Sequence, residues 1–143
     1  MCIRDRINYR SEDFVAVIRE RTQSRGAEVV IDLVGSHTAQ GNVDAAAIRG
    51  RIICVGRVAG LDATMNLDEF SRKRIHMIGV TFRTRSMEER IAAVRAFCDD
   101  ALPALAQGTI APVIDSVYPL REAAAAQEHM RANRHFGKIV LKV

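Results

Sequence analysis

A chain of 143 residues, 48% of them apolar, is long enough to fold as one domain with a real core. It has no run of about 18 apolar residues, and charges in residues 1–6 do not fit a signal peptide, so neither a membrane span nor secretion is predicted. The net charge of +4 is modest. The densest basic cluster is at 72–74, but only 5% of the chain is aromatic. Binding of nucleic acid is therefore a weak alternative that rests on charge alone, because such surfaces combine basic and aromatic side chains.

Cysteine and histidine spacing predicts neither disulfides nor a metal site. Cys2, Cys54 and Cys98 are an odd number without a C-x-x-C pair. Cys54 and Cys98 fit small apolar positions in a reducing cytoplasm. The four histidines form no i, i+4 pair and have no neighbouring cysteine, so we expect no metal ligands.

Strand-like and helix-like segments alternate from the start of the chain, which predicts an α/β fold with a largely parallel sheet. In chain order we expect a strand stub at 7–9, a helix over 14–22 capped by Ser11, a strand at 29–34, a helix over 39–48, a strand at 51–55, a helix over 67–73 and a strand at 76–82. The strand at 29–34 is apolar on both faces, as expected for a strand with helices on each side.

The alternation continues to the end of the chain. Ser86 and Glu89 form an S-x-x-E capping box at the start of the longest predicted helix. Its expected buried face consists of Ile91, Val94, Cys98, Ala101 and Leu105. A strand at 112–120, an alanine-rich helix over 121–133 and a terminal strand at 138–143 follow.

Three of the predicted strands end in segments that could contact a ligand. In an open parallel sheet, ligands bind beyond the carboxyl ends of the strands. The segments expected there are Val34–Gly35–Ser36, Val55–Gly56–Arg57 and Val80–Thr81–Phe82. Gly35 and Gly56 would let a flat ring or a sugar approach the backbone. The alternative is that these two glycines only close tight turns between a strand and a helix.

Recognised catalytic and phosphate-binding motifs are missing from the sequence. It contains no G-x-G-x-x-G, no G-x-x-x-x-G-K-[ST], no nucleophile elbow and no H-E-x-x-H. Asp32 lies inside a strand and Asp115 is isolated, and both fit a structural or capping carboxylate better than a general base. No catalytic residue is predicted.

Six segments, taken together and in order, resemble a known family. They are INYRSEDF (7–14), VVIDLVG (29–35), GRIICVG (50–56), IGVTFRTRS (78–86), PVIDSVYPLREAAAA (112–126) and HFGKIVL (135–141). They are similar to the C-terminal half of the zinc-independent, zeta-crystallin-like quinone oxidoreductases of the medium-chain dehydrogenase/reductase superfamily. The resemblance covers about 95% of the chain, from Ile7 to Val143.

The resemblance implies a fold, an activity and a cofactor. Residues 7–111 correspond to the later part of a doubly wound, Rossmann-like nucleotide-binding domain, and 112–143 to the C-terminal return to the catalytic domain. Residues 1–6 match nothing in the family and are expected to be a foreign head. The implied reaction is direct hydride transfer from NADPH, with NADH as an alternative, to a quinone or enone. The family uses neither metal nor obligatory base, and the intact enzyme is expected to be a cytoplasmic homodimer.

The family also implies which residues lie near the cofactor. The residue matching Tyr9 lies near the adenosine ribose and its phosphate, Ser36 lies beside the cofactor, and Asn133 matches a late contact. The predicted cofactor-binding residues are Tyr9, Gly35, Ser36, Val55, Gly56, Arg57, Val58, Val80, Thr81, Phe82 and Asn133. Arg57 departs from the smaller residue common at its position, and its guanidinium could either block the site or bind an acidic substrate.

The family's N-terminal catalytic domain and its glycine-rich turn have no counterpart in the sequence. We therefore expect a truncated, inactive part of such an enzyme. The alternative is a non-catalytic assembly module that pairs with a second copy through the apolar strand at 76–82, because an uncovered edge strand invites pairing.

Overall fold

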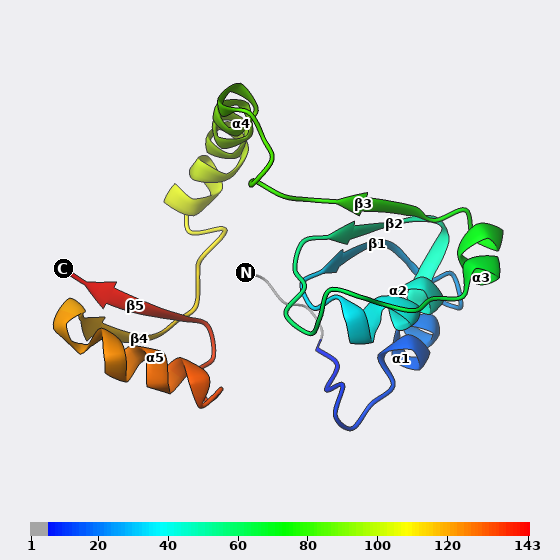
Figure 1. Ribbon diagram of the computed structural model, residues 1–143, viewed down its shortest axis with the longest axis horizontal. Helices are drawn as coiled ribbons and strands as arrows, with labels where there is room; N and C mark the ends of the chain where they lie inside the picture. The colour runs from blue at the N-terminus through cyan, green and yellow to red at the C-terminus, as the bar shows by residue number, and fades with distance from the viewer. Residues whose placement is uncertain (1–5) are drawn as a thin grey trace. The chain divides into compact units, whose positions relative to one another are not determined.

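The structure, a computed structural model, describes residues 6–143, which form two units that divide between Ser86 and Met87. Each unit contains its own parallel sheet (Figure 1). Of the predicted foreign head, residues 1–5 lie outside the described residues.

The first unit alternates helices and strands. Its elements are α1 (Phe14–Arg21), β1 (Ala27–Asp32), a 3-10 turn (Ser36–Thr38), α2 (Ala39–Ala45), β2 (Ala46–Cys54), α3 (Leu67–Arg72) and β3 (His76–Gly79). The strands are parallel in the order β1-β2-β3. Parallel neighbours need a crossover connection, and here α2 and α3 supply it. The predicted α/β class with a parallel sheet is confirmed.

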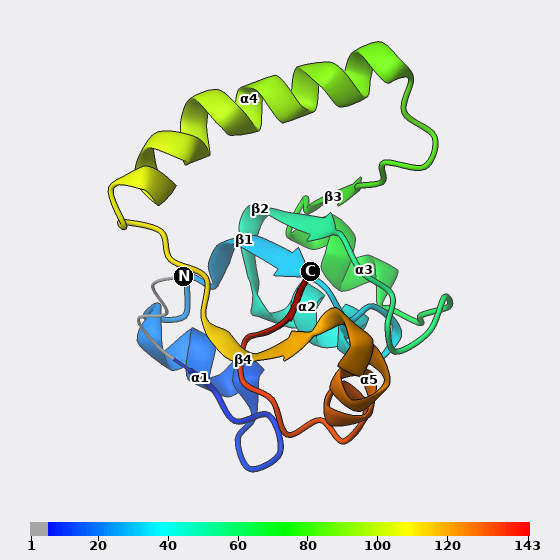
Figure 2. The ribbon, with the colours of Figure 1, turned by 90° about the vertical axis from the view of Figure 1, so that its left-hand side faces the viewer.

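One face of this sheet carries the core. Val30, Ile52 and Met77 are in register across the three strands and so share that face. Helix α2 packs on β1 and β2, and α1 packs on α2. Both figures show α2 beneath the strands (Figures 1 and 2). The core cluster is Val43, Ala46, Ile52 and Ile75.

The opposite face is apolar and largely open. Its middle row is Ile31, Ile53 and Ile78, again in register, and Ile31 is 66% exposed. Val29 and Leu33 are exposed beside it. In this unit helices cover one side of the sheet, because α2, with α1 packed on it, lies on the core side.

Several predicted ends are shifted for local reasons. Helix α1 is capped by Asp13, whose carboxylate accepts hydrogen bonds from the Val15 and Ala16 N–H groups, and not by Ser11. The helix predicted over 39–48 ends at Ala45, because the chain turns into β2 at Ala46, where the buried alanines 45–47 pack. Strand β3 ends at Gly79, so residues 80–82 of the predicted strand lie outside it, ahead of a turn at 83–84.

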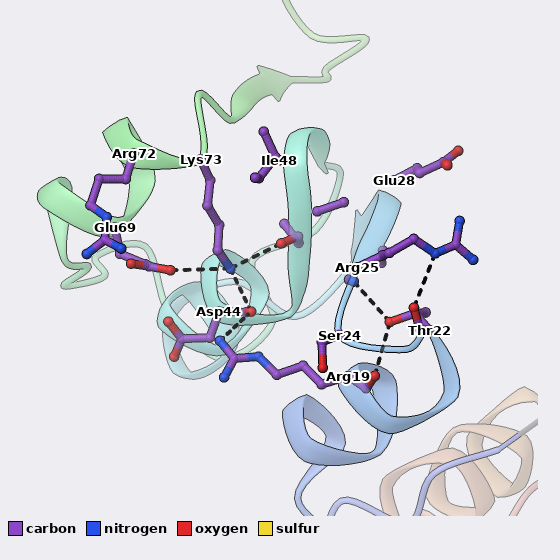
Figure 3. Close-up of a pocket in the computed structure, with 14 residues that line it drawn as sticks. Arg19, Thr22, Ser24, Arg25, Glu28, Asp44, Ile48, Glu69, Arg72 and Lys73 are labelled. Atoms are coloured by element: carbon purple, nitrogen blue, oxygen red, sulfur yellow. Dashed lines mark hydrogen bonds and ion pairs between the residues drawn. The ribbon is translucent and has the colours of Figure 1, made fainter.

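Lys73 fastens the end of α3 to the end of α2. Its Nζ donates hydrogen bonds to the carbonyl oxygens of Val43, Asp44 and Ala46 at 2.8–3.1 Å. It also lies 3.5 Å from a carboxylate oxygen of Glu69. Figure 3 shows the ammonium group between the Glu69 carboxylate and the Asp44 carbonyl oxygen. A cation at a helix C-terminus satisfies carbonyls that the helix leaves unpaired and complements its dipole.

Replacing Lys73 with methionine should therefore destabilise the first unit. The carbonyl oxygens would lose a charged donor at a site where the Lys73 side chain is only 14% exposed, a loss of about 2–4 kcal/mol. Arg72→Met is the matched control, because Arg72 is exposed and forms only a 3.9 Å ion pair with Asp68. Urea unfolding of both variants measures the difference, and equal midpoints would contradict the assignment.

The second unit begins with a long helix. Its elements are α4 (Met87–Ala106), β4 (Ile114–Pro119), a 3-10 turn (Leu120–Glu122), α5 (Ala123–Arg131) and β5 (Lys138–Lys142). β4 and β5 are parallel, and α5 packs on both. The predicted strand, helix and strand are thus present. No residue of α4 is buried, so the prediction of a buried face is wrong.

A polar cluster holds α5 and the approach to β5 against β4. Asp115 accepts a 2.8 Å hydrogen bond from the Phe136 N–H. His129 lies with Nδ1 3.0 Å from the Tyr118 hydroxyl and Nε2 3.7 Å from the Asp115 carboxylate. The Phe136 hydrogen bond is the main cause that lowers the pKa of Asp115, with smaller contributions from Ser116, His129 and His135.

This lowered pKa predicts acid sensitivity of the second unit. Asp115 contributes stability above its unfolded pKa of about 3.9, and the contribution is lost as pH falls through the lower folded pKa. In Asp115→Asn the free energy of unfolding should vary less steeply with pH on the acid side. Chemical unfolding at a series of acid pH values measures that slope. An unchanged slope would show that Asp115 is not responsible.

Candidate functional site

The carboxyl ends of β1 and β2 carry two turns that pack against each other. We call residues 33–36 the first turn and 55–60 the second turn. The Val55 and Gly56 N–H groups donate to the Asp32 carbonyl at 2.9 and 3.1 Å, and the Ala59 N–H donates to Val34 at 3.0 Å. The register of the parallel strands brings their ends together, and these hydrogen bonds fix the turns that follow.

Glycines make the close approach of the two turns possible. A Cβ on Gly56 would overlap the carbonyl group of Leu33, and one on Gly35 would lie 3.2 Å from the Cα of Arg57. Gly35 also has φ of 75°, a left-handed conformation that favours glycine. A Cβ on Gly60 would lie 3.2 Å from that of Ser36. Gly35 and Gly56 therefore allow the two turns to pack closely, whether or not a ligand contacts them.

Asp32 organises the first turn from the end of β1. One oxygen of its buried carboxylate accepts hydrogen bonds from the Val34 N–H at 2.8 Å, the Gly35 N–H at 3.0 Å and the Thr38 hydroxyl at 3.2 Å. The Thr38 hydroxyl also donates to the Gly35 carbonyl and lies 3.4 Å from the buried Asn42 amide. Hydrogen bonds that link Asp32, Thr38 and Asn42 thus hold the first turn in place.

The third predicted segment follows β3. The Val80 N–H donates to the Cys54 carbonyl at 3.1 Å, which keeps it beside the end of β2. Thr81 then folds back, because its carbonyl accepts from Arg85 Nε and its hydroxyl from the Arg83 N–H. The Arg85 guanidinium lies 5.5 Å from the centre of the Phe82 ring.

Charges of both signs lie near the turns. Burial, followed by the negative charge of Asp32, raises the pKa of the Cys54 thiol, while Arg57 acts in the opposite direction. A raised pKa keeps the thiol protonated, which argues against a nucleophilic role. The side chain of Arg57 is exposed. Val58 is also exposed, at 86%, so the second turn offers a cation and an apolar side chain together.

The structure assembles most of the predicted residues but not all. The first unit brings together Gly35 and Ser36, residues 55–58, and the start of 80–82. Tyr9 is 75% exposed in a turn before α1, and the structure records no hydrogen bond between it and these segments. Asn133 belongs to the second unit, just after α5, with φ of 51°.

Three residues that hold the turns were not predicted as part of the site: Asp32, Thr38 and Gly60. The sequence signal for Asp32 is its place at the end of an apolar strand and three residues before Gly35. That spacing is typical of a carboxylate that accepts backbone N–H groups of a turn.

The opposite end of the sheet has a separate cavity of about 960 Å³ (Figure 3). It is lined by residues around the starts of β1 and β2, among them Arg19, Arg25 and Lys73. These cations already donate to backbone carbonyls, Arg19 to Asp44 and Arg25 to Thr22. Ligands of parallel sheets bind at the carboxyl ends of the strands, so the turns remain the candidate site.

Neither a cluster of metal-ligating side chains nor a membrane-spanning helix is found among the described residues. Across residues 6–143, no three His, Cys, Asp or Glu side chains come together in a way that could hold a metal ion. The same residues include no helix with the length and hydropathy needed to cross a membrane.

A parallel sheet with glycine-containing turns at the carboxyl ends of its strands defines a Rossmann-like α/β domain. More particularly, the chain belongs to the zinc-binding dehydrogenase family, whose model matches residues 3–141.

Individual relatives agree with that assignment. The chain is 33% identical over 139 residues to a 2-haloacrylate reductase of a Burkholderia species, covering 94% of the chain and 40% of that protein. Among solved structures it resembles a quinone oxidoreductase of Pseudomonas syringae (27% identity, TM-score 0.72) and an NAD-dependent alcohol dehydrogenase (28%, TM-score 0.72). These cover 96% of this chain and 42% and 37% of the other chains. The predicted relationship to quinone oxidoreductases is confirmed, and the chain spans about two fifths of the length of these relatives.

The close packing of the turns gives a steric prediction. Gly56→Ala would place a methyl group against the Leu33 carbonyl, and we expect a loss of about 1–3 kcal/mol in unfolding free energy. Gly79→Ala is the control, because a Cβ there meets nothing within 4 Å. Urea unfolding compares them. If Gly56→Ala is as stable as Gly79→Ala, the two turns do not approach as described.

Proposed function

We propose that this chain forms part of the nicotinamide-binding domain of an oxidoreductase that reduces quinones or electron-poor alkenes. The observation that carries the proposal is the pair of packed turns at the carboxyl ends of β1 and β2 in a chain of this family. Its relatives named quinone oxidoreductase and 2-haloacrylate reductase support the substrate class.

The turns would serve as one wall for the nicotinamide half of the cofactor. When bound, the reduced nicotinamide supplies the hydride. Gly35 and Gly56 let the two turns pack into one continuous edge, and exposed apolar side chains such as Val55 and Val58 would contact the ring there. The protein's contribution is to orient ring and substrate, which is how binding energy lowers the barrier in such transfers.

Finer features belong to the same proposal. We propose NADPH as the preferred cofactor, with NADH as the alternative, a reaction without metal, and a cytoplasmic location. Arg57 is exposed at the end of the second turn, and none of the described residues forms an ion pair with it. Of the two roles predicted for it, binding an acidic group of the substrate fits that free guanidinium better than blocking the site.

The test is to titrate the isotope-labelled chain with NADPH and follow its backbone amide resonances. We expect shifts at residues 35–36, 55–58 and 80–82, because these segments carry the proposed wall. Residues 19–28, beside the cavity at the other end of the sheet, are the internal control and should not shift. Shifts confined to that cavity, or no shifts at high NADPH, would overturn the proposal.

Turnover by the 143-residue chain is a separate prediction. Its sequence has no G-x-G-x-x-G turn to hold a pyrophosphate, so NADPH would bind without the contacts that normally fix it. We expect no measurable loss of NADPH absorbance when the chain is mixed with NADPH and benzoquinone. Measurable turnover would contradict this expectation without affecting the binding proposal.

A second role, assembly through β3, is favoured by one observation. β3 is an edge strand that pairs only with β2, and its Ile78 is exposed. We propose that it pairs with β3 of a second copy, which would cover the open edge. Ile78→Lys should then shift the chain to a smaller species in size-exclusion chromatography, whereas Met87→Lys, exposed outside the strand, should not. An unchanged elution position for Ile78→Lys would reject this pairing.

A further inference from the structure

Asp32 is connected to both turns of the candidate site. Through its side chain it accepts hydrogen bonds from Val34, Gly35 and Thr38. Through its backbone carbonyl it accepts hydrogen bonds from Val55 and Gly56. A single residue at the end of β1 therefore bonds to the first turn and to the start of the second.

The conformation of the first turn requires such support. Gly35 has φ of 75° and Ser36 has φ of 23°, and positive φ at a non-glycine residue is uncommon. Strained backbone of this kind persists only where surrounding contacts impose it. The N–H groups of Val34 and Gly35, both hydrogen-bonded to the carboxylate, lie directly before the strained Ser36.

The carboxylate itself is buried and is committed to these contacts. Asp32 is 8% exposed, and among the described residues no lysine or arginine forms an ion pair with it. Its charge is therefore balanced by the turn's own N–H and O–H donors. Hydrogen bonds to an ionised acceptor are stronger than those between neutral groups, so the bonds fix the turn more firmly than a neutral acceptor would.

We propose that Asp32 is a positioning residue for the nicotinamide wall, which sets Gly35, Ser36 and Gly56 at the spacing a bound ring requires. This inference rests on the proposed function for the identity of the ligand. The order that Asp32 imposes on the turns is a property of the chain without ligand, so the two can be tested apart.

The experiment compares four variants with the unsubstituted chain in two measurements. Asp32→Ala removes all three side-chain bonds, Asp32→Asn keeps an oxygen acceptor, and Thr38→Val removes one donor. Ile52→Val trims a fully buried core residue away from the turns and controls for lost stability. The measurements are hydrogen exchange of the Val34 and Gly35 amides without ligand, and the NADPH dissociation constant from amide shifts.

In Asp32→Ala we expect exchange at both amides to rise about tenfold and the NADPH dissociation constant to rise about tenfold, the change that corresponds to one lost hydrogen bond to a charged group. Asp32→Asn should recover most of both losses. Thr38→Val should show a smaller effect in the same direction. Ile52→Val should lower stability and leave both measurements unchanged. If Asp32 had only a structural role, Asp32→Ala and Ile52→Val would affect the two measurements in the same way.

Different results would overturn different statements. If Asp32→Ala and Thr38→Val leave exchange at Val34 and Gly35 unchanged, Asp32 does not position the turn. If exchange rises but NADPH binds as before, the turn is ordered by Asp32 without serving the ligand. If Asp32→Ala and Ile52→Val lose the same affinity for NADPH, the weaker binding of Asp32→Ala follows from lost stability and not from the position of the turn. If NADPH fails to bind the unsubstituted chain, the proposed function fails, while the exchange data still decide whether Asp32 orders the turn.

Discussion

The contact between the backbone of Gly56 and the carbonyl of Leu33 is the constraint on which the arrangement of the first unit depends. It is possible only because residue 56 has no side chain. Together with the bonds to the Asp32 carbonyl it brings the two turns to a single edge of the sheet. The strands run in a common direction, but these contacts decide which residues lie together at the carboxyl edge of the sheet.

The two ends of the sheet differ in how their polar groups are used. At the amino ends of the strands, Lys73, Arg19 and Arg25 donate to backbone carbonyls, so their charge serves the packing of helices and loops. At the carboxyl ends, Asp32 is committed to the turn but Arg57 is exposed. The cavity of about 960 Å³ therefore lies at the end of the sheet whose cations already donate to backbone carbonyls.

The sequence predicted the class of fold and the order of strands, because those depend on local alternation of apolar segments. It also predicted that residues 34–36 and 55–57 follow the ends of two strands, because glycines follow two of the apolar runs. It did not predict the start of β2 at Ala46, since three successive alanines favour a helix until tertiary burial decides otherwise. The predicted buried face of α4 was wrong, because periodicity reports which face of a helix is apolar and not whether another surface covers it.

The open row Ile31–Ile53–Ile78 has a thermodynamic consequence. An exposed apolar face can be removed from water by association with another molecule, and association that involves only the folded form stabilises that form by mass action. If two copies associate through this face, the apparent midpoint of unfolding would rise with protein concentration, and the stability of the chain would depend on the solution as well as on the single molecule.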